Sequence, residues 1–269
     1  MTGHMVQGAG GALHIRVDGP EGAPWMVLSN SLGANLTMWD GQLDLLTRRY
    51  RVLRYDTRGH GLSETVVSPF GFDELVADMA AVMDACGIER ADVLGLSLGG
   101  MTGLGFALTH PERLGRLVCA DARAEATEAV RQMWDARIAA VGDGGLEAIL
   151  EGTLASWFTS DWRADNAREE QKIRDMILGN DPVGYVGCCH ALKTLDYLRR
   201  LGDIRAEVLY LVGSEDKGAP PDEMRTMAKA TPNARFVEIP GAAHLANINA
   251  PAPFNHSLID FLDIPPPPR

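Results

Sequence analysis

A serine, an aspartate and a histidine that could act together in nucleophilic catalysis occur in that order along this chain of 269 residues. The first is Ser97, which stands in a Gly-x-Ser-x-Gly pattern directly after the apolar run 93–96. A serine on a tight turn between a strand and a helix exposes its hydroxyl at the carboxyl edge of a sheet. The pattern therefore predicts a nucleophile elbow, in which Gly95 and Gly99 leave room for the strained backbone and for neighbouring strands.

A serine hydroxyl is a weak nucleophile, so it needs a base to take its proton and a third group to orient that base. In chains with such an elbow, an acid and then a histidine follow the serine in sequence. Asp216 comes just after the apolar run 208–212, and His244 comes after the next strand-like run, 236–239. We therefore predict a catalytic triad of Ser97, Asp216 and His244.

Two other acids could take the place of Asp216. Glu215 is its direct neighbour and is the obvious competitor for the acid role. Asp121 follows the strand-like run 117–120, so it would lie at the same edge of the sheet as Ser97. Motif position favours Asp216, because an acid after a late buried strand is the usual partner of the histidine.

Acyl transfer also needs backbone N–H groups that stabilise the negative charge on the attacked oxygen. One such donor is normally the residue after the nucleophile, which is Leu98 here. The other comes from the loop after the third strand, residues 30–33, where position selects Leu32. The nearby segment 56–63 groups Asp, Arg, His and Ser, but its glycines indicate a mainly structural loop.

The elements that must position these groups alternate between strand-like and helix-like runs. Such alternation predicts a doubly wound, mostly parallel sheet. Leu13, Ile15 and Val17 alternate with polar residues and favour an early edge strand, whereas residues 1–5 are given no weight. Residues 122–195 hold only helical patterns, at 124–141, 146–157, 167–178 and 185–195. We expect a core of residues 1–121 and 196–269, with 122–195 inserted as a helical cap.

Composition narrows the class of protein. The net charge of −11 argues against nucleic acid and anionic membranes as partners. Four cysteines, two of them adjacent, do not make a disulfide framework, and no signal peptide or apolar run long enough to span a membrane is present. We expect a cytoplasmic enzyme of unspecified oligomeric state. The chain lacks HExxH, paired CxxC and P-loop motifs, so we expect no metal and no cofactor.

Together these residues resemble the α/β-hydrolase superfamily over nearly the whole chain. Within it, the chain is most similar to the 3-oxoadipate enol-lactonases of aromatic-compound catabolism. The similar segments are residues 30–33 with Trp39 and Asp40, residues 95–101, Trp157 with Phe158, and residues 244–248. The resemblance implies an α/β-hydrolase fold with a helical cap, and the triad given above.

The resemblance also implies a small unsaturated lactone that carries a carboxylate as the substrate. In an acidic protein, that carboxylate would need a cation. Arg131 and Arg137 flank Trp134 in the first helix of the cap and are the candidates, with Trp157 as a further substrate-binding residue. Arginines on an amphipathic helix are otherwise solvent-exposed groups.

Other functions remain open at this stage. A broad-specificity carboxylesterase or lactonase of the same fold, with perhydrolysis as a side activity, would need no cation in the cap. A third hypothesis is a ligand-binding protein that has lost most of its catalytic activity, and the intact set of Ser, Asp and His argues against it. A dehalogenase is disfavoured because it requires an aspartate at the position of Ser97.

Overall fold

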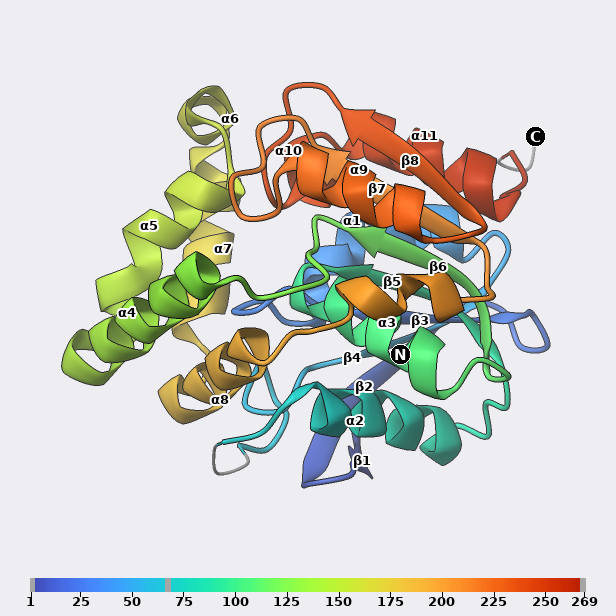
Figure 1. The fold of residues 1–269 in the computed structure, drawn as a ribbon. Helices are drawn as coiled ribbons and strands as arrows, with labels where there is room; N and C mark the ends of the chain where they lie inside the picture. Colours follow the sequence, from blue (N-terminus) through green and yellow to red (C-terminus); the bar gives the residue numbers. More distant parts are fainter. Residues whose placement is uncertain (1–2, 66–68, 267–269) are drawn as a thin grey trace.

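The computed structural model describes residues 3–65 and 69–266, which contain an eight-stranded sheet in the order β1-β2-β4-β3-β5-β6-β7-β8 (Figure 1). The strands are β1 (His4–Gln7), β2 (Ala12–Asp18), β3 (Trp25–Ser29), β4 (Arg51–Tyr55), β5 (Ala91–Leu96), β6 (Leu114–Ala120), β7 (Val208–Gly213) and β8 (Ala234–Ile239). β2 runs antiparallel to both of its neighbours, and the pairs from β4 to β8 are parallel. The predicted mostly parallel sheet is confirmed.

Helices cover both faces of this sheet (Figure 1). On one face α2 (Phe72–Ala85), α3 (Leu98–Thr109), the short 3-10 helix η2 (Leu198–Asp203) and α9 (Pro221–Ala230) pack in a row. The other face carries α1 (Asp40–Leu46), which follows the 3-10 helix η1 (Leu36–Trp39), together with α10 (Ala246–Asn249) and α11 (Pro251–Leu262). The sheet is therefore the middle of three layers.

The central strands are mostly apolar and buried because helices cover both of their faces. In β5, for example, Val93, Leu94 and Leu96 are fully buried. The helices instead bury one stripe, as α2 does with Leu75, Met79 and Val82. Burial of these apolar groups fixes the sheet, and the sheet fixes the loops at the carboxyl ends of its strands.

Five α-helices lie between β6 and β7 in sequence and gather at one side of the sheet (Figure 1). We call them the cap helices: α4 (Glu128–Gly144), α5 (Glu147–Trp157), α6 (Ser160–Asp165), α7 (Ala167–Leu178) and α8 (Pro182–Lys193). The chain enters and leaves this group at one place, where Glu125 and Asp196 form an antiparallel bridge. The N–H of Tyr197 donates to the carbonyl of Ala124 at 2.7 Å beside it.

Some expected elements differ from those observed. The segment 13–17 is not an edge strand, because His4–Gln7 pairs along the open side of β2 and becomes the edge itself. The helix expected from residue 124 begins at Glu128, since residues 124–126 are extended against the segment that leaves the cap helices. The short helix α6 was not expected, and Thr159 caps it by accepting a hydrogen bond from the N–H of Trp162.

Two further observations bear on the class of protein. In the described part of the chain, no helix has the length and apolar character needed to cross a membrane. All four cysteines are free thiols, and Cys119, Cys188 and Cys189 are buried. Burial raises the pKa of the Cys189 thiol to about 12, so this group stays protonated at neutral pH.

Candidate active site

Ser97 occupies a strained turn between β5 and α3. Its backbone has φ 56° and ψ −116°, a conformation that residues other than glycine rarely adopt. The N–H of Ser97 donates to the carbonyl of Ala120 in β6 at 2.8 Å, and its own carbonyl accepts from the N–H of Met101 at 2.9 Å. The neighbouring strand and the following helix thus hold the serine in a geometry that such residues adopt mainly at functional sites.

The two glycines of the elbow are required by space. A Cβ atom on Gly95 would lie 2.2 Å from the carbonyl oxygen of Gly99. On Gly99, a Cβ atom would lie 2.1 Å from the carbonyl oxygen of Ser29 in β3. In both cases the obstructing atom is backbone, which cannot move without shifting a strand or the helix. The expected role of these glycines in close approach is confirmed.

Gly99→Ala is therefore expected to destabilise the fold by about 3 kcal/mol, since the overlap forces β3 and α3 apart. In thermal unfolding this corresponds to a Tm lower by about 6–12 °C. Gly152→Ala is the matched control, because a Cβ atom there meets nothing within 4 Å on the exposed side of α5. It should raise stability by up to about 1 kcal/mol. If Gly99→Ala has the same Tm as the wild type, the close approach of residue 99 to the Ser29 carbonyl does not contribute to stability.

His244 and Asp216 come from the loops that follow β8 and β7, and the structure brings them together. The distance from His244 Nδ1 to Asp216 Oδ2 is 2.8 Å, and both side chains are buried. The other carboxylate oxygen, Oδ1, accepts hydrogen bonds from the N–H groups of Gly218 and Ala219 at 2.7 and 3.0 Å. Because the carboxylate accepts from Nδ1, Nε2 is the ring nitrogen left to act as a base.

The two alternative acids lie elsewhere. Glu215 is exposed, and its side chain makes no hydrogen bond to His244. Asp121 is fully buried and accepts a hydrogen bond from the N–H of Gly213 at 2.9 Å, but it has no hydrogen bond to His244 either. Of the three acids considered, only Asp216 has the geometry that orients the imidazole.

The two expected oxyanion donors come from separate parts of the chain. Leu98 is the first residue of α3, and Leu32 belongs to the loop after β3. Within residues 3–65 and 69–266, neither N–H donates to another protein group. Free N–H groups at the start of a helix and in such a loop are suited to bind developing negative charge.

The loop that contains Leu32 is held by the segment 56–63. The N–H of Gly33 donates to Nε2 of His60 at 3.0 Å, and Nδ1 of His60 lies 3.1 Å from the carbonyl oxygen of Arg58. Burial lowers the pKa of His60, which keeps the ring neutral and able to accept the Gly33 hydrogen bond. Arg58 in turn forms an ion pair with Asp78 at 2.6 Å, so this segment ties loops together, as expected.

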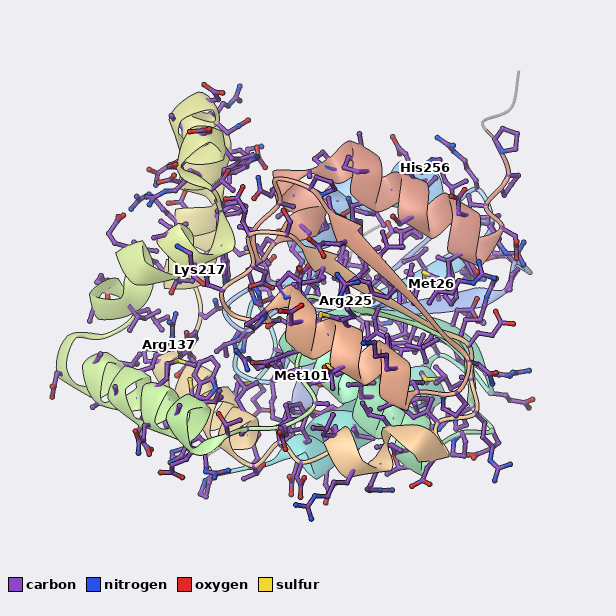
Figure 2. The ribbon with its side chains drawn as sticks, turned by 45° about the horizontal axis from the view of Figure 1, so that its top comes forward. Met26, Met101, Arg137, Lys217, Arg225 and His256 are labelled. Carbon is purple, nitrogen blue, oxygen red and sulfur yellow. The ribbon has the colours of Figure 1, made fainter. Side chains whose placement is uncertain are left out.

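Ser97 and His244 line one cavity of about 270 Å³, which lies between the core and the cap helices. Most of its wall is apolar or aromatic, and the lining includes Leu32, Met101, Trp134, Trp157, Tyr185 and Leu192. Figure 2 labels Met101 on α3, Arg137 on α4 and Lys217 on the loop after β7. A mostly apolar cavity with a few polar groups is typical of a site for a small organic ligand.

Arg137 is the cation most firmly placed in this wall. Its Nε donates to the hydroxyl of Tyr185 at 2.7 Å, and its guanidinium also contacts Thr153 and lies over the ring of Trp134. Burial raises the pKa of Tyr185, so the phenol stays neutral. Among the described residues no carboxylate lies within 4.0 Å of Arg137, and its positive charge is therefore not neutralised.

Arg131, the other expected cation, does not line the cavity. Its side chain is exposed, and it bonds to Glu128 at 3.2 Å and to the carbonyl of Ala126. The expectation that both arginines bind substrate is corrected by helix geometry. Val130, Trp134 and Arg137 recur at helical spacing and form the stripe of α4 that lines the cavity, whereas residue 131 lies about 100° around the helix from Val130 and outside that stripe.

Other polar residues line the cavity without having been selected from the sequence. The hydroxyl of Ser31 is buried and has no hydrogen-bond partner in the part of the chain that the structure describes. Lys217 also reaches the cavity, while Arg123 lines it but is paired with Glu223 and donates to the carbonyl of Gly218. Ser31 precedes Leu32 in the sequence, and Lys217 follows Asp216. Their positions next to predicted site residues were the signal that could have identified them. Nothing local distinguishes Arg123.

A family profile and two similar proteins of known sequence all indicate the same kind of protein. The profile of the alpha/beta hydrolase fold family matches residues 24–251. The 3-oxoadipate enol-lactonase 2 of Acinetobacter baylyi is 33% identical over 247 residues, which cover 92% of this chain and 91% of the relative. A protein of Caulobacter segnis named "Putative carbamate hydrolase RutD" is 32% identical over 242 residues, or 88% of this chain and 91% of that one.

The same relationship holds for solved structures. The enol-lactonase from Burkholderia xenovorans LB400 superposes with a TM-score of 0.94 at 35% identity, covering 97% of this chain and 100% of that one. The match extends over the sheet and the cap helices alike. From its fold, its family profile and these relatives, the chain belongs to the alpha/beta hydrolase fold family and is a hydrolase.

Proposed function

We propose that this protein is a serine hydrolase that opens a small lactone or ester through an acyl-enzyme, with 3-oxoadipate enol-lactone as the leading substrate. Support for the reaction type comes from Ser97 and His244 in one cavity and from the 2.8 Å contact between His244 and Asp216. The enol-lactonases among its relatives support the substrate. Free thiols support a reducing, cytoplasmic location.

The proposed reaction begins when Ser97 Oγ attacks the lactone carbonyl while His244 Nε2 takes its proton. The N–H groups of Leu32 and Leu98 stabilise the oxyanion, each by about 3 kcal/mol. The ring C–O bond then breaks, His244 returns the proton to the leaving enol oxygen, and the enol converts to a ketone. Finally, water gives a proton to His244 Nε2 and attacks the acyl carbon. The bond from that carbon to Ser97 Oγ breaks, His244 returns the proton to Oγ, and the dicarboxylate product leaves.

The single observation that carries the choice of substrate is the unpaired charge of Arg137. The protein has a net charge of −11, and acids neutralise several of its buried or half-buried arginines, such as Arg54, Arg58 and Arg123. An arginine that faces a catalytic cavity with only neutral partners is a site for an anion, since a guanidinium binds a carboxylate through paired hydrogen bonds. Trp134 and Trp157 would pack against the rest of the ligand.

The test is steady-state hydrolysis of 3-oxoadipate enol-lactone beside a neutral lactone, p-nitrophenyl acetate and a small carbamate, with Ser97→Ala as the blank. A strong preference for the enol-lactone supports the proposal. Preference for neutral esters or lactones would replace it with a broad-specificity carboxylesterase, for which perhydrolysis is a side activity to assay. Preference for the carbamate would align the protein with its RutD-named relatives.

Arg137→Met is expected to lower kcat/KM for the enol-lactone by about 10–100-fold, because a charged hydrogen bond to the substrate is lost. For p-nitrophenyl acetate the change should stay within about threefold, since that ester has no carboxylate. Arg131→Met is the matched control on the same helix and should leave both substrates unaffected. Equal losses on both substrates would indicate that Arg137 serves the structure of the cavity through Tyr185 and Thr153, rather than the substrate.

A further inference from the structure

A second buried carboxyl group lies beside the proposed triad. Asp121 directly follows β6, is fully buried and has φ 47°, a left-handed conformation that is rare for residues with a side chain. Its N–H donates to the carbonyl of Leu211 at 2.8 Å, which fixes the turn against β7. This backbone directs the side chain toward the loop that holds Asp216.

The partners of Asp121 are few. Its Oδ1 accepts from the N–H of Gly213 at 2.9 Å. The backbone N–H of Ala246 also acts on the carboxyl group and lowers its pKa, but no donor of the described residues meets the geometry of a hydrogen bond to the buried Oδ2. No lysine, arginine or histidine of residues 3–65 and 69–266 forms an ion pair with it. Its backbone and its Oδ1 are bonded to Leu211 and Gly213 at the end of β7, three residues before Asp216, and the Asp216 carboxyl group is one cause of the raised pKa of Asp121.

Two ionised carboxylates in contact, with no cation between them, repel strongly in a buried site. One of the two must therefore keep a proton. Asp216 already accepts hydrogen bonds from His244, Gly218 and Ala219, so both of its oxygens have donors with which an added proton would compete. Asp121 has fewer donors, so it is the better place for the proton. Burial and the charge of Asp216 both raise the pKa of Asp121, in agreement with this assignment.

We propose that Asp121 is a positioning residue, whose protonated Oδ2 donates a hydrogen bond to the Asp216 carboxylate and holds that carboxylate toward His244. The inference rests on the proposed function in one respect, namely that His244 is the catalytic base. A proton on Oδ2 also accounts for the absence of a hydrogen-bond donor to this buried oxygen, because the protonated oxygen is itself a donor.

The titratable groups around Asp121 are consistent with a single proton in this position. Asp216 faces it from the loop after β7, with His244 on the other side of Asp216. Cys119 approaches from β6, and burial together with Asp121 raises the pKa of its thiol, so it remains neutral. The charge of the site is then one carboxylate beside one imidazole.

Two substitutions separate the proton from the backbone. Asp121→Asn keeps a donor and an acceptor of the same shape, and asparagine tolerates positive φ. Asp121→Gly tolerates the same φ but removes the donor. With p-nitrophenyl acetate, the asparagine variant should keep kcat within about twofold, and the acidic limb of its pH profile should not move. The glycine variant should lose about tenfold in kcat at unchanged KM, because Asp216 is no longer held.

A second measurement does not depend on activity. Unfolded Asp121 loses its proton near pH 4 while the folded residue keeps it, so the wild type loses stability as pH rises above that point. The amide introduced by Asp121→Asn does not titrate, so Tm of this variant minus Tm of the wild type should increase from about pH 4 to about pH 8. A wild type inactive on every substrate would refute the proposed function and leave this test of the proton intact.

Three results would overturn the proposal. If Asp121→Asn moves the acidic limb of the pH profile to lower pH, Asp121 carries a charge that assists protonation of His244. If the difference in Tm decreases from about pH 4 to about pH 8, the folded carboxyl is ionised. If Asp121→Gly retains the kcat of the wild type in an active enzyme, the hydrogen bond does not position Asp216.

Discussion

Ser97→Ala is expected to lower kcat for every ester and lactone by about 10⁵–10⁶-fold, leaving only the contribution of the oxyanion donors and of binding. The substitution removes the attacking oxygen and nothing else, because no hydrogen bond from the Ser97 side chain stabilises the fold among the described residues. Alanine meets the same strain at φ 56° that serine does, so Tm should be unchanged. Turnover of p-nitrophenyl acetate and thermal unfolding measure both outcomes.

Ser156→Ala is the matched control for that experiment. Ser156 lines the same cavity from α5, but it lies outside the strand-to-helix turn and should retain activity within a few-fold of the wild type. A fluorophosphonate probe should label the wild type and Ser156→Ala and leave Ser97→Ala unlabelled. Labelling or turnover of Ser97→Ala near the level of the wild type would place the nucleophile at another residue.

Asp216→Asn is expected to reduce kcat by about 10⁴-fold with little change in KM. The carboxylate oxygen accepts from His244 Nδ1, whereas an asparagine amide turned toward the ring would donate to it and stabilise the wrong tautomer. The N–H groups of Gly218 and Ala219 can still bond to the amide oxygen, so the loop should stay folded. Steady-state kinetics and Tm check the two parts of this expectation.

Glu215→Gln provides the adjacent control, because it removes the neighbouring charge without contact to His244. It should leave kcat within about twofold of the wild type. The assignment of the acid is overturned if Asp216→Asn stays active while Asp121→Asn or Glu215→Gln does not.

The fold and the elements that carry the candidate catalytic groups could be predicted because they depend on local patterns. The apolar runs that became β5 and β7 are continuous in sequence, and the turn after β5 needs glycine on both sides of Ser97. Since parallel strands end at one edge of the sheet, groups that follow different strands, such as Asp216 and His244, converge without any local signal of contact.

The cavity could be predicted only in part, because its electrostatics depend on tertiary neighbours. Arg131 and Arg137 are both candidates in the sequence, and the structure separates them because Tyr185 and Thr153, which are distant in sequence, contact Arg137 at the cavity while Arg131 lies outside its lining. The pairing of Arg123 with Glu223 spans a hundred residues of chain. The early strand was wrongly predicted to form the edge of the sheet for a similar reason. His4–Gln7, a segment with no distinct pattern of its own, pairs along its open side.

The bridge between Glu125 and Asp196 has a consequence for how this protein could diversify. Since the segment between these residues starts and ends at one point, its length and content can change without altering the distance between β6 and β7. Ser97 is encoded before that segment, and Asp216 and His244 after it, yet all three are held by the sheet. Recombination that exchanges the intervening stretch of gene would thus carry a new specificity onto an unchanged reaction, and chimeric proteins can be built at the same two junctions.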